Sequence, residues 1–117
     1  MSIGDYFASG PSFERPVFDE VMRRLADVGP IHIEPVSVGI FLKNPRKFME
    51  LRPLRSWVAV SFTLRRVAQH RTIVRKVVSY GQSSAAMYHT ANIARPDDID
   101  DALGAMFVEA YNEAPDD

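Results

Sequence analysis

Two kinds of hydrophobic periodicity divide the chain, and their order constrains the fold more than any other feature. Apolar residues recur every three or four positions only near the two ends, in residues 12–28 and 95–114. Between them, residues 31–94 contain short runs in which apolar and polar residues alternate, separated by turn residues. Short turns favour antiparallel neighbours, and a run of strands between two helices is typical of the α+β class. We therefore expect an antiparallel sheet of about five strands, with an N-terminal and a C-terminal helix packed on one face.

Both terminal segments have the signals of amphipathic helices. The first is predicted to begin at Ser12 as N-cap and to end before Gly29-Pro30. The second is predicted to begin at Asp97 or Asp98, where acids meet the positive end of the helix dipole. The apolar stripes that should face the core are Val17, Val21, Met22, Leu25 and Val28 in the first helix and Ile99, Leu103, Met106, Phe107 and Ala110 in the second.

The clearest strand is "SWVAVSFTLR", residues 56–65. Its alternation predicts that Val58, Val60, Phe62 and Leu64 face the core. Trp57, at its start, and Arg65, at its end, should lie on the other face. The remaining strands are expected in residues 31–43, 47–51, 72–80 and 85–94. Within the first of these, a proline at position 35 cannot donate to a ladder, so it marks a sheet edge, a bulge or a break between two short strands.

Length and composition favour one small intracellular domain. A chain of 117 residues has the commonest single-domain size, so we expect one domain over residues 1–117. It has no cysteine, which excludes disulfides, thiolate metal sites and a cysteine nucleophile. Its first ten residues lack the features of a signal peptide, and no apolar run is long enough for a membrane helix. We therefore expect a soluble, cytoplasmic protein that is not embedded in a membrane.

Charge is strongly segregated along the chain although the net charge is only −1. Residues 43–76 contain ten basic residues and one acid, a local charge of +9, whereas both flanking segments are acidic. An aromatic and basic sheet face can stack bases and neutralise phosphates. The chain is therefore predicted to be a non-catalytic binding domain for an anionic partner, most plausibly nucleic acid. The candidate binding residues are Lys43, Arg46, Lys47, Arg52, Arg55, Trp57 and Arg65, with Phe41 beside them.

Other interpretations of the same residues stay open. Tryptophan, phenylalanine and arginine are also favoured at protein interfaces, so the surface is equally consistent with a homodimer or an adaptor that self-associates. The basic strands could instead pair with acids of the terminal helices and leave no exposed patch. A small-molecule pocket between sheet and helices is the least favoured alternative.

Motifs for catalysis, cofactors and metals are weak or absent. The histidines at positions 32, 70 and 89 do not have metal-ligand spacing; we expect His70 to be a solvated loop residue and His89 a satisfied, partly buried one. Two serines, Ser83 and Ser84, lack a nucleophile elbow, and no glycine-rich phosphate loop is present. Acids at positions 97, 98, 100 and 101 are interpreted as helix caps rather than a cation site. We therefore predict no catalytic residues, no metal and no cofactor.

Several motifs together resemble a known family. The chain opens with Tyr6-Phe7 and a Gly-Pro pair, ends its first helix with "VGP", continues with the strand "VGIFLKNPRKFMEL" and starts its last helix with "DDID". This pattern covers most of the chain and is similar to a bacterial domain of unknown function, family 5655, which also occurs at the C-terminus of predicted transport proteins. The resemblance implies the fold and a middle region rich in basic and aromatic residues. It implies no reaction and no catalytic residues.

Overall fold

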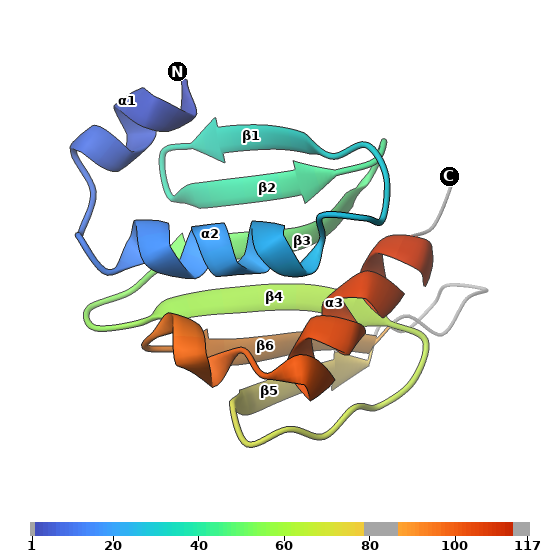
Figure 1. Cartoon of the computed structure of the whole chain (residues 1–117). Helices are drawn as coiled ribbons and strands as arrows, with labels where there is room; N and C mark the ends of the chain where they lie inside the picture. Colours follow the sequence, from blue (N-terminus) through green and yellow to red (C-terminus); the bar gives the residue numbers. More distant parts are fainter. Residues whose placement is uncertain (1, 79–86, 114–117) are drawn as a thin grey trace.

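The computed structural model describes residues 2–78 and 87–113, which form three helices, a 3-10 turn and six strands (Figure 1). The helices and the turn are α1 (Ile3–Ala8), α2 (Glu14–Arg24), η1 (Pro96–Asp98) and α3 (Asp101–Glu113). The strands are β1 (His32–Val36), β2 (Gly39–Lys43), β3 (Lys47–Pro53), β4 (Val58–Leu64), β5 (Ile73–Val78) and β6 (Met87–Ile93). The α+β prediction, with an antiparallel sheet and helices from both ends of the chain, is confirmed.

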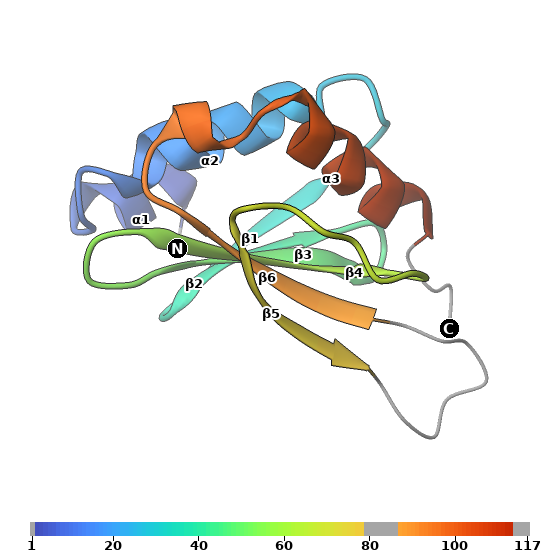
Figure 2. The same ribbon diagram turned by 90° about the horizontal axis from the view of Figure 1, so that it is seen from below.

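One six-stranded sheet has the order β1-β2-β3-β4-β6-β5, and every neighbouring pair is antiparallel. α2 and α3 lie on one face of this sheet, and α1 lies beside β1 (Figures 1 and 2). None of the described helices covers the opposite face, which we call the open face (Figure 2). Strand register and burial assign to it Glu34, Phe41, Lys43, Lys47, Glu50, Arg52, Ala59, Ser61, Thr63, Arg75, Tyr88, Thr90 and Asn92.

The sheet has one strand more than the predicted five because the first alternating segment is a hairpin. β1 and β2 pair directly, with Val36 opposite Gly39, so Ser37 and Val38 form the turn. Pro35 lies inside β1, where it faces Ile40, and does not break the segment. β1 is an edge strand, and a proline is tolerated there because one side of the strand has no ladder to complete.

Both long helices begin later than the sequence suggested. α2 begins at Glu14 with Phe13 in the N-cap position, instead of after Ser12. α3 begins at Asp101, and the carboxylate of Asp100 accepts the Leu103 N–H at 2.9 Å. Asp98 instead caps the preceding 3-10 turn, accepting the N–H groups of residues 94 and 95. Asp98 and Asp100 therefore act as caps, as expected, but the chain makes one extra turn before the helix starts.

The predicted core is confirmed at the central strand. Val58, Val60, Phe62 and Leu64 of β4 are at most 1% exposed and face the two long helices. The Phe62 ring meets the Phe107 ring of α3 edge-on, with centroids 5.4 Å apart. All five stripe residues predicted for the C-terminal helix are buried, although Ile99 precedes α3. Of the stripe predicted for the N-terminal helix, Val17, Val21 and Leu25 are buried, whereas Met22 and Val28 are partly buried.

His89 of β6 fixes the connection between β4 and β5, which crosses β6 on the helix side of the sheet (Figure 2). Its side chain is fully buried and stacks on the Phe62 ring with centroids 5.5 Å apart. Its Nε2 accepts the Ala68 N–H at 3.0 Å, so the proton is on Nδ1, which donates to the Met87 carbonyl at 2.9 Å. Burial lowers the pKa of His89, and the nearby cations Lys76 and Arg66 lower it further.

Replacing His89 with leucine should destabilise the fold and also change its pH dependence. The variant leaves the Ala68 N–H and the Met87 carbonyl without partners, at a cost of about 1–3 kcal/mol at pH 7. In the wild type the unfolded chain takes up a proton near pH 6.5 that folded His89 resists, so stability falls as pH drops below about 6.5. Urea unfolding at pH 7 and pH 5 should show a smaller pH-dependent loss in the variant. An unchanged loss would show that other groups cause it.

No helix among residues 2–78 and 87–113 is both long and apolar enough to cross a membrane.

Candidate functional site

A β-bulge places a pair of lysines on the open face. The register between β2 and β3 shifts after Leu42, which pairs with Met49, so that Lys43 pairs with Lys47. Phe48 is the extra residue, and it turns toward α3, where its ring packs edge-on against Tyr111 with centroids 5.1 Å apart. A bulge of this kind re-aims the side chains beside it. Lys47 therefore shares the open face with Glu50, three residues later, and their side chains bond at 2.9 Å.

Phe41 is the centre of the resulting cluster. Lys47 Nζ lies 4.5 Å and Lys43 Nζ 5.9 Å from the Phe41 ring centroid, both within cation–π range. The two lysines, the ring, Pro45 and Arg46 line a shallow depression of about 300 Å³. We call Phe41, Lys43, Arg46 and Lys47 the Phe41 cluster.

The Phe41 cluster keeps a positive balance although two acids contact it. Lys43 Nζ is 2.7 Å from Glu34 Oε1, and hydrogen bonding to this ammonium lowers the pKa of Glu34. Lys47 is paired with Glu50. Three cations therefore face two carboxylates, and both ion pairs are partly exposed. Exposed pairs are worth little, so an anionic ligand can compete for the lysines.

Helix α3 holds the turn that carries the cluster. Asn44 Nδ2 donates to the Tyr111 hydroxyl at 2.6 Å, and this hydroxyl donates to the Pro30 carbonyl at 2.9 Å. Because Phe48 packs on the same tyrosine, the β2–β3 turn is fixed to the helix layer. The backbone that carries the Phe41 cluster is therefore held in place by contacts with α3.

The candidate binding residues predicted from the sequence fall into two groups at opposite ends of the sheet. Lys43, Arg46, Lys47 and Arg65 lie at the end where β3 begins, since Met49 pairs with Phe62 near the end of β4. The other group is Arg52, Arg55 and Trp57, at and beside the β3–β4 turn, where Leu54 N–H donates to the Trp57 carbonyl. Lys47 and Arg52, the nearest members of the two groups on β3, are five positions apart, a span of roughly 17 Å. They do not form one compact rim.

Exposed apolar residues accompany the second group. Leu54 and Trp57 are 43% and 36% exposed. Val38, at 50% exposure, belongs to the β1–β2 turn, whose next residue, Gly39, packs against the backbone of Leu51 and Arg52. This end of the sheet therefore has more the character of a protein contact than of a phosphate-binding surface.

A second hollow, of about 350 Å³, was not predicted from the sequence. It lies on the open face, over β3, β4, β6 and β5, because the side chains in its centre, Ala59, Ser61 and Thr90, are short. Longer side chains border it; these are Glu50, Arg52, Leu54, Val74, Arg75, Tyr88 and Asn92. The hollow forms only because β6 lies between β4 and β5. Alternation within single strands does not reveal this strand order, so the sequence does not predict the hollow.

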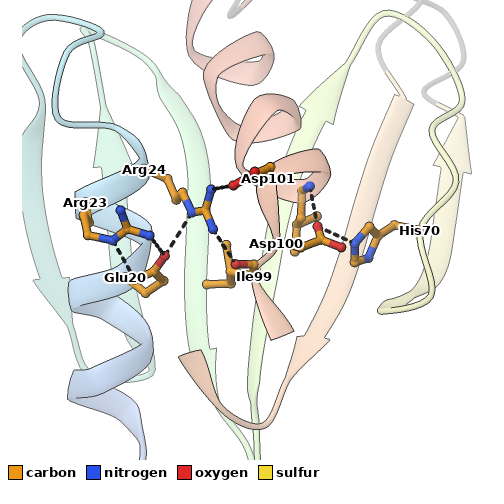
Figure 3. A network of polar contacts seen from close by, with 8 residues as sticks. Glu20, Arg23, Arg24, His70, Ile99, Asp100 and Asp101 are labelled. Atoms are coloured by element: carbon orange, nitrogen blue, oxygen red, sulfur yellow. Dashed lines mark hydrogen bonds and ion pairs between the residues drawn. The ribbon is translucent and has the colours of Figure 1, made fainter. Parts of the chain in front are cut away.

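A network of polar contacts lies on the helix side (Figure 3). Arg24 of α2 donates to Glu20 at 2.9 Å, to Asp101 at 2.6 Å and to the Ile99 carbonyl at 2.9 Å. Its side chain is only 18% exposed, and it crosses Gly104, where a Cβ would lie 2.8 Å from the arginine Cδ. Arg24 therefore joins α2 to the start of α3. The depression beside it is bordered by four acids and two arginines. Both arginines are engaged by Glu20 and Asp101, and Asp100 is bound by His70, so we interpret the network as structural.

His70 differs most from its prediction. It was expected to be solvated, but its side chain is only 6% exposed. Its Nε2 is 2.9 Å from an Asp100 oxygen (Figure 3). Its Nδ1 is 2.8 Å from the Thr72 hydroxyl. The loop sequence alone gives no sign of this burial, because Asp100 is 30 residues away.

The Asp100–His70–Thr72 order is that of a catalytic triad, but its setting favours a structural role. Nδ1 of His70 also accepts the Thr72 N–H at 3.2 Å. The backbone N–H and the hydroxyl of Thr72 therefore compete for the same imidazole nitrogen. Thr72 is only 5% exposed, which leaves little access for a substrate. Asp100 is held by the Leu103 N–H, which with His70 lowers the pKa of the carboxyl. We therefore interpret these hydrogen bonds as a structural link between the β4–β5 connection and the start of α3.

Other reactive groups are either structural or outside the described residues. Glu14 is fully buried, accepts the Tyr6 hydroxyl at 2.5 Å, and has a pKa that burial raises. It ties α1 to α2. In residues 2–78 and 87–113, no three side chains of His, Cys, Asp or Glu come together as a metal site. Ser83 and Ser84 lie outside the described residues.

Comparison with known families agrees with the pattern of motifs. A family model of a domain of unknown function, DUF5655, matches residues 3–114, from the first residue of α1 to beyond α3. The chain belongs to the DUF5655 family. No curated protein and no solved structure matches it. DUF5655 membership confirms the resemblance seen in the sequence but assigns no activity.

Proposed function

We propose that this DUF5655 chain is a non-catalytic binding module whose open face binds single-stranded nucleic acid. The observation that carries the proposal is the Phe41 cluster, in which two lysine ammonium groups lie 4.5 and 5.9 Å from the centroid of an aromatic ring. A base can stack on such a ring while the cations contact the flanking phosphates. Sheet faces with exposed aromatic residues bind RNA in this way.

The charge layout of the described residues supports this orientation. The helices and the 3-10 turn carry nine acids and three arginines, so the helix side is acidic overall. The open face carries Lys43, Arg46, Lys47, Arg52 and Arg75 against Glu34 and Glu50. An anionic strand would therefore meet a more favourable potential on the open face than over the helices.

Fluorescence anisotropy with a labelled twelve-nucleotide single strand tests the proposal. With about three phosphate contacts, from Lys43, Arg46 and Lys47, the log–log dependence of the association constant on salt should have a slope of about −2. Replacing Phe41 with alanine should weaken binding by about 1–3 kcal/mol, since one stacked base is lost. Replacing Arg15 of α2 with glutamine is a control, because its 62% exposed side chain lies on the helix layer. Equal losses in both variants would refute the proposal.

Self-association is the second candidate function, favoured by the exposed Val38, Leu54 and Trp57 at the other end of the sheet. Light scattering of the free protein distinguishes the two. One outcome is a dimer that dissociates in Trp57→Ala, together with no binding of any oligonucleotide at 50 mM salt. This outcome would assign the functional surface to the end of the sheet with Trp57, and the Phe41 cluster would then be solvent-exposed without a ligand.

A further inference from the structure

We propose that the hollow over β3, β4, β6 and β5 recognises guanine in the bound strand. This inference rests on the function proposed above and names the base that the open face prefers. The hollow has about 350 Å³ of space, and it lies directly beside the Phe41 cluster, since Phe41 pairs with Glu50 across β2 and β3. A strand whose one base stacks on Phe41 can therefore place a nearby base over the hollow.

One transverse row of paired residues sets the geometry of the hollow. Strand register puts Phe41, Glu50, Ser61, Thr90 and Arg75 side by side across five strands. Ser61 and Thr90 share a hydrogen bond of 3.1 Å, and their short side chains form the floor of the hollow. Tyr88 borders the hollow and offers a second aromatic surface against which a base can pack.

A carboxylate and a guanidinium lie together at one side of the hollow. Glu50 and Arg52 are two residues apart on β3, so their Cα atoms are roughly 7 Å apart and their side chains share a face. Glu50 Oε1 is bound by Lys47, but Oε2 makes no hydrogen bond to another described residue. The same is true of the side chains of Arg52 and Asn92, which also border the hollow. The border of the hollow therefore has a hydrogen-bond acceptor, Glu50 Oε2, and a donor, the Arg52 guanidinium, that a ligand can use.

Guanine matches this pair of groups better than the other bases do. Its N1–H and N2–H₂ groups are neighbouring donors for a carboxylate, and its O6 and N7 are neighbouring acceptors for an arginine fork. Adenine and cytosine present one amino group next to acceptors, and uracil presents one N–H between two carbonyls. None of them offers both two neighbouring donor groups for Glu50 and two neighbouring acceptors for Arg52. A base that donates only one hydrogen bond to the Glu50 carboxylate, or accepts only one from Arg52, therefore binds less tightly.

The test compares labelled ten-nucleotide oligouridylates that carry one central guanosine, adenosine, cytidine or uridine. The wild type should bind the guanosine strand on the order of tenfold tighter than the other three. Glu50→Gln should reduce this preference to less than about twofold. Because Glu50→Gln also removes a negative charge, affinity for plain oligouridylate should stay equal or rise, so the preference ratio separates recognition from general electrostatics.

Glu34→Gln is the matched control. It makes the same charge change on the same face but outside the hollow, and it should keep the guanosine preference. If Glu50→Gln does not fold, the exposed Arg52 provides the second variant: Arg52→Gln should also lower the preference by removing the donor for O6 and N7. Binding without guanosine preference, or a preference that survives Glu50→Gln or Arg52→Gln, overturns the inference alone. Failure of every strand to bind overturns the proposed function as well.

Discussion

Replacing Phe62 with alanine should lower the free energy of unfolding by about 3–5 kcal/mol, the largest stability effect that we expect from a single change. Phe62 is 1% exposed at the centre of β4, stacked on His89 and edge-on to Phe107. Truncation leaves a cavity lined by two aromatic rings. A domain of this size has a total stability on the order of 6–18 kcal/mol, so the loss is a large fraction of it.

Thermal unfolding followed by circular dichroism measures this effect. We expect the midpoint to fall on the order of 10–20 °C. Val74→Ala is a suitable control, because Val74 is 64% exposed on the edge strand β5 and its truncation should change stability by less than about 0.5 kcal/mol. A shift of only a degree or two in Phe62→Ala would contradict the packing of β4 described above.

The largest functional effect is expected from neutralising both lysines of the Phe41 cluster. Each phosphate contact on a single strand contributes about −0.7 to the salt slope, which corresponds to about fivefold in affinity at 0.1 M relative to 1 M salt. The double variant Lys43→Gln, Lys47→Gln should therefore bind about 25-fold more weakly at 0.1 M salt. Its salt slope should fall from about −2 to about −0.7. Glutamine is preferred to glutamate because a new acid would repel Glu34 and Glu50.

The matched control for this double variant removes two charges from the helix layer. Arg15 and Arg23 have side chains 62% and 65% exposed on α2, and Arg15→Gln, Arg23→Gln changes the net charge equally. This control should change affinity less than threefold, an order-of-magnitude expectation for charges outside the contact region at moderate salt. An equal loss in both double variants would mean that the strand responds to net charge and not to the Phe41 cluster.

The sequence was sufficient for the fold class because local patterns and global packing agree. Alternation in β4 identified its buried face, and the stripe of α3 identified the residues that meet it. The strand order was not accessible, since β4 joins β6 while β5 occupies the edge, and no local pattern encodes that crossing. The burial of His70 and the buried role of His89 depend on the same crossing, because both bind groups distant in sequence.

The candidate site could be predicted only in part. Charge segregation located Lys43, Arg46 and Lys47 correctly as neighbours, and sequence proximity explains why. Arg52, Arg55 and Trp57 belonged to the same basic segment, yet β3 carries them to the other end of the sheet. The bulge at Phe48 was also unforeseen, although it decides which way Lys47 points. The sequence therefore shows which segment is basic, but strand direction and register determine which of its charged side chains lie close together.

The most direct measurement of the central claim is an NMR titration of the ¹⁵N-labelled protein with an unlabelled single strand containing one guanosine. The proposed function predicts that amide shifts concentrate on the open face, in residues 41–52, 59–63 and 88–92, and leave residues 14–24 of α2 unchanged. No shifts at any strand concentration, or shifts confined to α2 and the Arg24 network, would contradict it.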